Sequence, residues 1–239
     1  MDVRGKVVLI TGASAGIGLC TAQAFAGAGG KLSLVARSAD LLEQLADELR
    51  GQGTEAIAIC ADMRDPEQVT RAGAQTAEHF GRIDILINNA GQSVLGTVAD
   101  LNLDHFRQVV ELNLFGPVIA MQAVIPIMRA HGGGIIINVS SMVSKMNLYG
   151  LAGYACTKSA LNMISDTARD ELAQDNIRVI SIFPRTTATD FHVSALGGSG
   201  RETRPKPSST GPVIIDPPEH VADRILLAAI EEPEEQYME

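Results

Sequence analysis

The chain has 239 residues, of which 46% are hydrophobic, and it carries a formal net charge of −9 at pH 7. This acidic balance argues against nucleic acid and anionic membranes as partners, since both require a basic patch. The length supports one sizeable core, and no linker rich in Pro and Ser divides residues 1–190, so residues 1–239 are predicted to form a single domain.

The cysteines and the apolar runs bear on the cellular compartment. Cys20, Cys60 and Cys156 stand at irregular spacing, form no metal motif and suggest no disulfide framework, which suits a reducing cytoplasm. The first residues lead straight into a strand without an apolar signal region, and no apolar run approaches the ~20 residues that a membrane span requires. We therefore expect a cytoplasmic protein with no metal and no membrane partner.

A glycine-rich turn follows the first apolar run. Residues 6–11 are predicted to form a strand and residues 19–27 a helix, with the turn between them. Glycines there let the backbone approach a pyrophosphate, and the N–H groups and dipole of the helix start favour its negative charge. Such a turn alone can be merely tight, but its place after the first strand of a βαβ unit predicts dinucleotide binding. The candidate contacts are Gly12, Ser14, Gly16, Ile17 and Gly18.

The second predicted strand, over 31–36, ends in Ala36 and Arg37 rather than in an acidic residue. A carboxylate there would bond the two ribose hydroxyls of NAD and repel a 2′-phosphate, whereas an arginine can clamp that phosphate. Ala36 leaves the place of such a carboxylate vacant. The alternative is that Arg37 only caps the loop or pairs with Asp40. The pattern favours NADP(H) as the cofactor, with NAD(H) possible.

An acidic residue follows the third predicted strand, over 54–60. A carboxylate just past a strand end is usually a helix cap or a solvated loop residue. In a doubly wound sheet, Asp62 would instead lie at the adenine end of the cofactor crevice, with Met63 beside it, and both interpretations stay open. Pro66 at a first helical position then predicts a helix over 66–80.

The fourth predicted strand, over 83–87, leads into Asn88, Asn89, Ala90 and Gly91. Amides followed by small residues suit a backbone that lies beside a ribose, with an Asn side chain bonding neighbouring strands. Asn89, Ala90 and Gly91 are candidate cofactor contacts. The amides could also merely connect the strands, an alternative that applies above all to Asn88.

A long helical pattern covers 103–130, with expected interruptions at Gly116-Pro117 and at Pro126. Asn113 is a polar residue among apolar neighbours in this pattern. A lone Asn in an apolar helix usually satisfies a local backbone hydrogen bond.

Three polar side chains in the middle of the chain suggest acid/base chemistry. Ser141 follows the β-branched run 134–140, which is typical of a strand buried on both faces, and open parallel sheets bind ligands at such strand ends. Tyr154 and Lys158 lie one turn apart on a predicted helix that starts near residue 152. A cation beside a phenol favours the phenolate, so the pKa of Tyr154 is expected to fall toward the working pH. Standing alone, such a pair is more often a solvated pair on a surface helix.

The last part of the chain combines regular elements with an irregular segment. A strand is predicted over 176–183, a helix over 217–230 and a short edge strand over 236–238. Residues 191–213 show no periodicity and contain several Gly and Pro, so they are interpreted as a mobile loop that folds over a ligand, or as plain disorder.

These motifs occur together and in a fixed order. They are Thr11-Gly12-x-x-x-Gly16-x-Gly18, Asn88-Asn89-Ala90-Gly91, the four residues Asn113, Ser141, Tyr154 and Lys158, and Pro184 to Thr189. The set resembles the short-chain dehydrogenase/reductase superfamily, in its single-domain NADP(H)-preferring branch, over nearly the whole chain. The resemblance implies an α/β fold with a Rossmann-type doubly wound parallel sheet of about seven strands and helices on both faces.

The resemblance also implies an oxidoreductase that transfers a hydride between NADP(H) and a small-molecule carbonyl or secondary alcohol. Tyr154 would exchange a proton with the substrate oxygen, and Ser141 would hydrogen-bond that oxygen. Lys158 would lower the pKa of Tyr154 and bond the nicotinamide ribose, and Asn113 would hold a water of the proton relay. The nicotinamide-side loop would contribute Pro184, Thr187 and Thr189. Two departures are Arg185, where the family usually has glycine, and Cys156-Thr157, which replaces Ala-Ser.

Two other functions are compatible with the same motifs. One is a catalytically silent nucleotide-binding sensor or scaffold, against which the presence of all four catalytic residues argues. The other is a lyase or epimerase with transient hydride transfer, whose family members usually carry a larger substrate lobe. Substrate selectivity is expected in residues 93–95, 142–150 and 191–213, because such loops vary on a fixed scaffold.

A homodimer or homotetramer is predicted from two helical segments. The helix around Asn113 and the helix over 152–174 carry apolar residues on more than one face, and the family usually pairs these helices across a two-fold axis. The apolar residues are Phe106, Val109, Leu112, Leu161, Met163 and Ile164.

Overall fold

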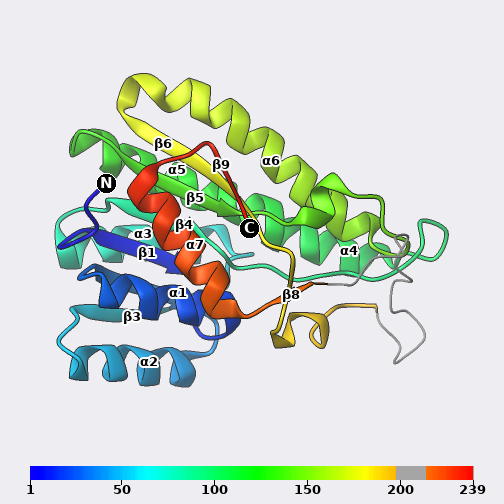
Figure 1. Cartoon of the computed structure of the whole chain (residues 1–239), viewed down its shortest axis with the longest axis horizontal. Coiled ribbons are helices and arrows are strands. Elements are labelled where there is room, and N and C mark those ends of the chain that lie inside the picture. Colours follow the sequence, from blue (N-terminus) through cyan, green and yellow to red (C-terminus); the bar gives the residue numbers. More distant parts are fainter. Residues whose placement is uncertain (198–213, 239) are drawn as a thin grey trace.

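A seven-stranded sheet forms the centre of the protein (Figure 1), whose computed structural model describes residues 1–197 and 214–238. All six strand pairings are parallel, and the strand order is β3-β2-β1-β4-β5-β6-β9. The direction of winding therefore reverses between β1 and β4. The strands are β1 Val7–Thr11, β2 Lys31–Ala36, β3 Ala56–Cys60, β4 Ile85–Asn88, β5 Gly134–Val139, β6 Ile177–Phe183 and β9 Glu235–Tyr237.

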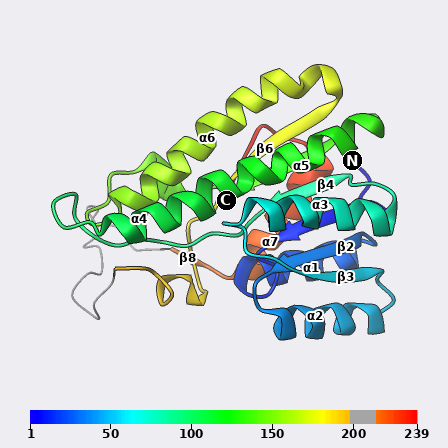
Figure 2. The ribbon, with the colours of Figure 1, turned by 180° about the vertical axis from the view of Figure 1, so that it is seen from behind.

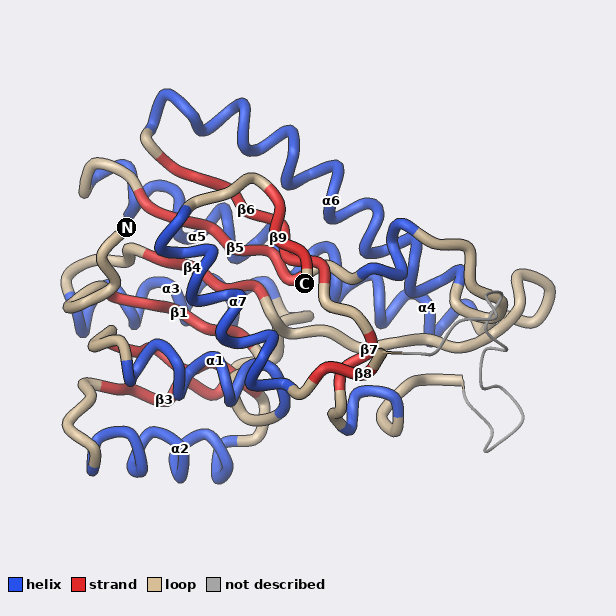
Figure 3. The backbone as a smooth tube through the Cα atoms, viewed as in Figure 1, coloured by secondary structure: helices blue, strands red, loops and turns tan. Residues whose placement is uncertain are grey.

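Helices cover both faces of this sheet, which confirms the predicted fold class. One face carries α1, α2 and α7, and the other carries α3, α5 and α6, as the two opposite views in Figures 1 and 2 show. Figure 3 shows the strands enclosed between these two layers. The helices are α1 Gly16–Gly27, α2 Ala39–Gly51, α3 Pro66–Phe80, α4 Leu103–Val110, α5 Gly116–Ala130, α6 Ala152–Leu172 and α7 Pro218–Glu231.

The strand sequences explain why the sheet is covered on both sides. Every residue of β5 is buried, and successive side chains of a strand point to opposite faces. Ile135 and Ile137 accordingly pack in the cluster that contains Phe25 of α1, whereas Ile136 packs in the cluster that contains Val124 of α5. Unbroken apolar strands of this kind are stable only between two helical layers.

The segment 103–130 is one continuous helical run rather than the interrupted helix that was expected. A π-helical turn over Glu111–Phe115 joins α4 to α5, and Pro117 lies in the first turn of α5, where its missing N–H matters little. Pro126 lies inside α5 and leaves the carbonyl of Gln122 without its helical partner. Both residues are exposed, so water can satisfy that carbonyl.

This continuous helix corrects the expectation that no apolar run reaches the length of a membrane span. Leu103–Ala130 has 28 residues, and its most apolar stretch has a mean hydropathy of 1.5, which is long and apolar enough to span a membrane by length and composition. In the described chain, 33% of that stretch is buried. The inner face of α5 packs on α3, β4 and β5, so part of this apolar character belongs to the core.

Residues 186–197 and 214–216 contain structure that the sequence did not predict. Two short parallel strands, β7 Thr186–Thr187 and β8 Ile215–Asp216, pair with each other outside the main sheet. A 3-10 turn over Asp190–His192 follows, and Leu196 is bonded to residues 93–95 through two backbone hydrogen bonds. The start of the predicted mobile loop 191–213 is therefore anchored, and its remainder, 198–213, lies outside the described residues.

The buried carboxylate of Asp84, at the amino end of the strands, allows a test of fold stability. Asp84 accepts a hydrogen bond from the Val7 backbone N–H at 2.9 Å and pairs with Arg82. Asp84→Ala removes the acceptor from a buried N–H, so the free energy of unfolding should fall by about 3 kcal/mol. Asp175→Ala, which breaks the exposed pair with Arg129, should cost less than about 1 kcal/mol. Urea unfolding of both variants checks this, and similar losses in both would contradict it.

Candidate active site

The predicted site residues lie at one edge of the sheet because all its strands run in the same direction. The glycine turn follows β1, Arg37 follows β2, and Asp62 follows β3. Asn89 follows β4 and Ser141 follows β5. Since the carboxyl ends of parallel strands share an edge, residues far apart in sequence meet there, at the point where the strand order reverses.

The glycine turn is shaped for close backbone approach. Gly12 and Gly16 have φ angles of +68° and +53°, in the left-handed region that favours glycine. A Cβ on Gly18 would lie 2.1 Å from the Gly12 carbonyl oxygen, so no larger residue fits there. The helix start of α1 has no capping side chain at Ala15 and no acidic residue in its first turn. Its free N–H groups therefore suit a pyrophosphate, with Ser14, half-buried, beside them.

The segment after β4 is held against this turn. The Asn89 side chain donates to the Thr11 carbonyl oxygen at 3.0 Å, and the Asn89 and Ala90 backbone N–H groups donate to Thr11 Oγ1. Asn88 donates to Asn138 Oδ1 at 2.9 Å, which is the strand-connecting arrangement that was the alternative for this residue. Both amides thus fix the sheet edge, and contact of 89–91 with a cofactor stays a prediction.

Four polar side chains of the predicted catalytic group gather around α6. Lys158 Nζ donates to the Val139 carbonyl oxygen at 2.8 Å. The Ser141 hydroxyl accepts from the Val143 N–H at 3.2 Å, and the Ser141 side chain acts on Tyr154 so as to favour its phenolate form. A Cβ on Gly91 would lie 3.4 Å from Asn113 Oδ1 and 3.6 Å from Lys158 Nζ, so the segment after β4 adjoins the same cluster.

Asn113 is fully engaged by protein groups. Its Oδ1 accepts from the Gln92 N–H at 2.9 Å, and its Nδ2 donates to the Gln92 carbonyl oxygen and to Thr157 Oγ1. Thr157, one of the departures from the family pattern, donates in turn to the Tyr154 carbonyl oxygen. The Asn113 side chain therefore ties the π-helical turn to α6 and to the segment after β4.

Burial sets the proton affinities of the two central groups. Tyr154 is 7% exposed and its ring contacts that of Phe191, with 5.6 Å between the ring centroids. Burial raises the pKa of Tyr154 to about 12, and the Ser141 side chain opposes the rise only in part. Burial also lowers the pKa of Lys158, which is 4% exposed, to about 8. The expected lowering of the Tyr154 pKa by Lys158 is therefore wrong, because desolvation of the phenolate dominates.

Two arginines, Arg37 and Arg64, follow strands β2 and β3 near the carboxylate of Asp62. Arg37 is exposed and does not take part in the ion pairs of the described residues, so its expected alternative partner Asp40 is not engaged. Asp62 is bound by Arg64, with Nη2 2.6 Å from Oδ2, and this contact lowers the pKa of the carboxyl. This ion pair with Arg64 was not predicted from the sequence.

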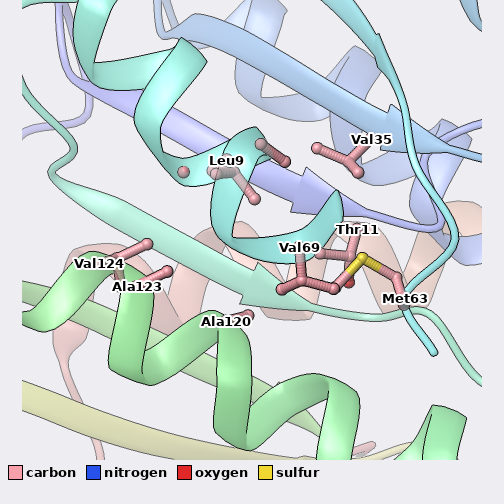
Figure 4. A pocket seen from close by; sticks show the side chains of 10 residues that line it. Leu9, Thr11, Val35, Met63, Val69, Ala120, Ala123 and Val124 are labelled. Atoms are coloured by element: carbon pink, nitrogen blue, oxygen red, sulfur yellow. The ribbon is translucent and has the colours of Figure 1, made fainter. Parts of the chain in front are cut away.

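The side chain of Met63, a predicted cofactor contact, points into the core. It lines a core cavity of about 10 Å³ between the sheet and helices α3 and α5 (Figure 4). Its side chain is buried among apolar residues, so only its backbone is available to a cofactor. The cavity is lined by Leu9, Thr11, Val35, Met63, Val69, Ala72, Gly73, Ala120, Ala123 and Val124. With this almost wholly apolar lining and this size, it is a packing gap of the core.

The segment after β6 closes the site on its other side. The Pro184 carbonyl oxygen accepts from the Met142 N–H at 2.9 Å, one residue beyond Ser141. Thr189 Cγ2 would lie 3.2 Å from a Cβ on Gly16, so this residue touches the glycine turn. Thr187 lies between them, buried in β7. The predicted contacts of 184–189 thus sit between the predicted catalytic group and the glycine turn.

Fold and site together define a doubly wound α/β protein with a glycine turn suited to a dinucleotide. A family model described as short chain dehydrogenase matches residues 6–196, and the chain belongs to this family. It is 36% identical over 202 residues to dehydrogenase/reductase SDR family member 7B of Mus musculus. That alignment covers 83% of this chain and 62% of the mouse protein, so the chain spans less than two thirds of the relative's length.

Two solved structures of the same fold contain different cofactors. A 7α-hydroxysteroid dehydrogenase complexed with NADH and 7-oxo glycochenodeoxycholic acid has a TM-score of 0.85 and 28% identity, covering 95% of this chain and 88% of its own. L-Sorbose reductase from Gluconobacter frateurii, complexed with NADPH and L-sorbose, has a TM-score of 0.83 and 30% identity, covering 96% and 92%. Both nicotinamide cofactors therefore occur on closely similar folds.

Proposed function

We propose that the protein is an oxidoreductase that transfers a hydride between NADP(H) and a carbonyl or secondary alcohol. The observation that carries the proposal is the buried cluster of Ser141, Tyr154 and Lys158, next to a glycine turn whose helix start has free N–H groups. A proton donor, an oxygen-binding hydroxyl and a cation beside a dinucleotide turn form the set that carbonyl reduction needs. The bound nicotinamide would supply or accept the hydride.

Each of the four side chains has a separate task in this proposal. Tyr154, with its pKa raised to about 12, is protonated at neutral pH and can donate its proton to the substrate oxygen. Ser141 orients that phenol and binds the same oxygen. Lys158, with its pKa lowered to about 8, can lose and regain a proton near neutral pH and so resupply Tyr154. Asn113 holds the segment after β4 against α6. A water of the proton relay, held at Asn113, is a further part of this proposal.

The proposed activity is tested by following the absorbance of the reduced nicotinamide with a panel of aldehydes, ketones and secondary alcohols. Both NADP(H) and NAD(H) should be included, together with a direct binding titration of each cofactor. Turnover with at least one substrate pair is expected. Tight cofactor binding without any turnover would instead support the silent sensor or scaffold.

Cofactor choice is proposed to depend on Arg37, whose exposed guanidinium is free to bind a 2′-phosphate. Ala36 is buried in the core, so a carboxylate introduced there would be desolvated, and Arg37→Ala alone is the cleaner test. A charge-assisted contact contributes roughly 1.5 to 3 kcal/mol, so NADPH should bind roughly 10- to 150-fold more weakly while NADH is unchanged. Arg178→Ala, at the amino end of β6, serves as the control. Tighter binding of NADH than of NADPH by the parent protein would refute the preference.

A dimer or tetramer is proposed through α5 and α6. Two of the apolar residues expected at this interface, Val109 and Leu161, are buried within the chain, whereas Met163 is 66% exposed. Met163 lines an open, mainly apolar groove of about 290 Å³ between the two helices. Its lining residues are Val118, Met121, Gln122, Ile125, Met163, Ile164, Thr167, Ala168, Glu171 and Leu172.

Met163→Glu should shift the protein toward the monomer, because it places a charge in that apolar groove. Leu41→Glu, on the outer side of α2 and 54% exposed, should leave the oligomer intact. Light scattering at micromolar concentration measures the mass of each variant. A monomeric parent protein, or equal dissociation in both variants, would count against this interface.

A further inference from the structure

Arg185, which stands where the family usually has glycine, forms a two-pronged ion pair with Asp216. Arg185 Nε and Nη2 each donate to a different carboxylate oxygen of Asp216, both at 2.9 Å. The Asp216 side chain is 7% exposed and that of Arg185 is 30% exposed. Bidentate pairs of this type fix geometry as well as charge, so the contact is more than a loose surface attraction.

The ion pair joins two segments that are distant in sequence. Arg185 directly precedes β7, and Asp216 ends β8, which pairs with β7 in parallel (Figure 3). The Ala188 N–H also donates to the Asp216 carbonyl oxygen at 2.9 Å. Side chain and backbone of Asp216 therefore hold the same short stretch, 185–188, from one side.

That stretch is in contact with both halves of the proposed site. On one side Pro184 accepts the N–H of Met142, next to Ser141. On the other side Thr189 packs against Gly16 of the glycine turn. Thr187 Oγ1 donates to the Arg185 carbonyl oxygen at 3.1 Å, which couples the arginine backbone to the residue between these two contacts. A displacement of 185–188 would therefore disturb both of these contacts.

We propose that Arg185 and Asp216 are positioning residues for the nicotinamide half of the cofactor. This inference rests on the proposed function. Two strands of two residues each, outside the main sheet, offer little stability of their own, and the ion pair supplies the missing constraint. When Arg185 is replaced, the buried carboxylate of Asp216 remains unpaired, and when Asp216 is replaced, the guanidinium of Arg185 does. In either case β8 separates from β7 so that the unpaired group reaches water. Neither residue contacts the reacting atoms; both act through 186–189.

The test compares a whole cofactor with a fragment that lacks the nicotinamide. Asp216→Asn, Arg185→Gln and the double variant are titrated with NADPH and with adenosine 2′,5′-bisphosphate. Each single variant should bind NADPH about 10-fold more weakly. Binding of the bisphosphate, whose groups lie at the other end of the site, should change less than about 2-fold. The double variant should resemble the single variants, because both substitutions remove one interaction.

Turnover provides an independent readout. Misplacement of the nicotinamide should lower kcat by about 10- to 100-fold in both single variants. Arg129→Gln, which breaks the exposed pair with Asp175, is the control and should change neither binding nor kcat. Thermal unfolding is measured in parallel, and Arg185→Gln keeps the test valid if Asp216→Asn does not fold, since Arg185 is the more exposed partner.

The possible results separate this inference from the proposed function. Selective loss of NADPH binding and of kcat, with the bisphosphate unaffected, supports the positioning role. Equal weakening of both ligands, or full activity in all variants, overturns it while leaving the oxidoreductase proposal in place. A parent protein that binds neither NADPH nor NADH overturns both.

Discussion

Tyr154→Phe is expected to abolish turnover, with kcat reduced by about 10³-fold or more, while cofactor affinity stays within about 2-fold of the parent. The substitution removes only the phenol hydroxyl and keeps the ring that packs against Phe191. The proton donor is therefore lost without creating a cavity. Steady-state rates and a direct titration of the cofactor measure the two quantities separately.

The matched control is Tyr237→Phe in β9. Tyr237 also donates a hydroxyl hydrogen bond, to Glu235 at 2.6 Å, but it lies on the edge strand of the sheet. This variant should keep kcat within about 2-fold. Turnover of Tyr154→Phe within about 10-fold of the parent would remove Tyr154 from the central role.

Lys158→Met is expected to eliminate activity and yet to stabilise the folded protein at neutral pH. The buried ammonium has a folded-state pKa of about 8, against an ordinary value of 10.5. Such a shift corresponds to a cost on the order of 3 kcal/mol. Loss of the hydrogen bond to the Val139 carbonyl oxygen offsets about 1 kcal/mol of the stability gained by removing the ammonium. The free energy of unfolding should therefore rise by about 2 kcal/mol at pH 7.

The effect of Lys158 on stability depends on pH, because its pKa differs between the folded and the unfolded chain. Between pH 8 and pH 10.5 the unfolded chain binds a proton that the folded chain does not, so the stability of the parent rises with pH across this window. Below pH 8 the cost of burying the ammonium is fully present, and above pH 10.5 it is absent. The advantage of Lys158→Met should accordingly shrink as the pH is raised from 7 to 9.5.

Urea unfolding at several pH values measures this difference, with Lys31→Met as the control. Lys31 lies in an exposed pair with Glu55, so its replacement should change stability by less than about 0.5 kcal/mol at every pH. A Lys158→Met variant that is less stable than the parent at pH 7 would contradict the buried, destabilised ammonium. Unchanged kcat in that variant would contradict its proton-supplying role.

Much of the fold was predictable because its signals are local. The strand predicted over 31–36 is β2 with the same bounds, and the predicted edge strand at the C-terminus is present as β9. Pro66 does begin α3, where Asp65 caps the helix by accepting the Glu67 and Gln68 N–H groups. Periodicity and caps depend on neighbours in sequence, so one chain is enough to find them.

The features that were missed depend on contacts between distant residues. The Arg185–Asp216 ion pair joins positions 31 residues apart, and the pairing of β7 with β8 also joins distant segments. Two-residue strands leave no periodic signal. The pKa of Tyr154 was predicted in the wrong direction because spacing along a helix reports the neighbouring cation but not the burial by Phe191. Met63 was predicted beside the cofactor from its position after a strand, and that position did not reveal that its side chain turns into the core.

The central claim is that this chain moves a hydride at the Tyr154 site, and isotope transfer measures that step directly. A ketone that the protein reduces is incubated with NADPH dideuterated at the nicotinamide C4, and the alcohol is analysed by mass spectrometry and NMR. The account predicts an alcohol with one deuterium, on the carbinol carbon, and a hydroxyl proton drawn from the solvent. It predicts that Tyr154→Phe forms no such alcohol. An unlabelled alcohol, or equal labelling by the parent and by Tyr154→Phe, would contradict it.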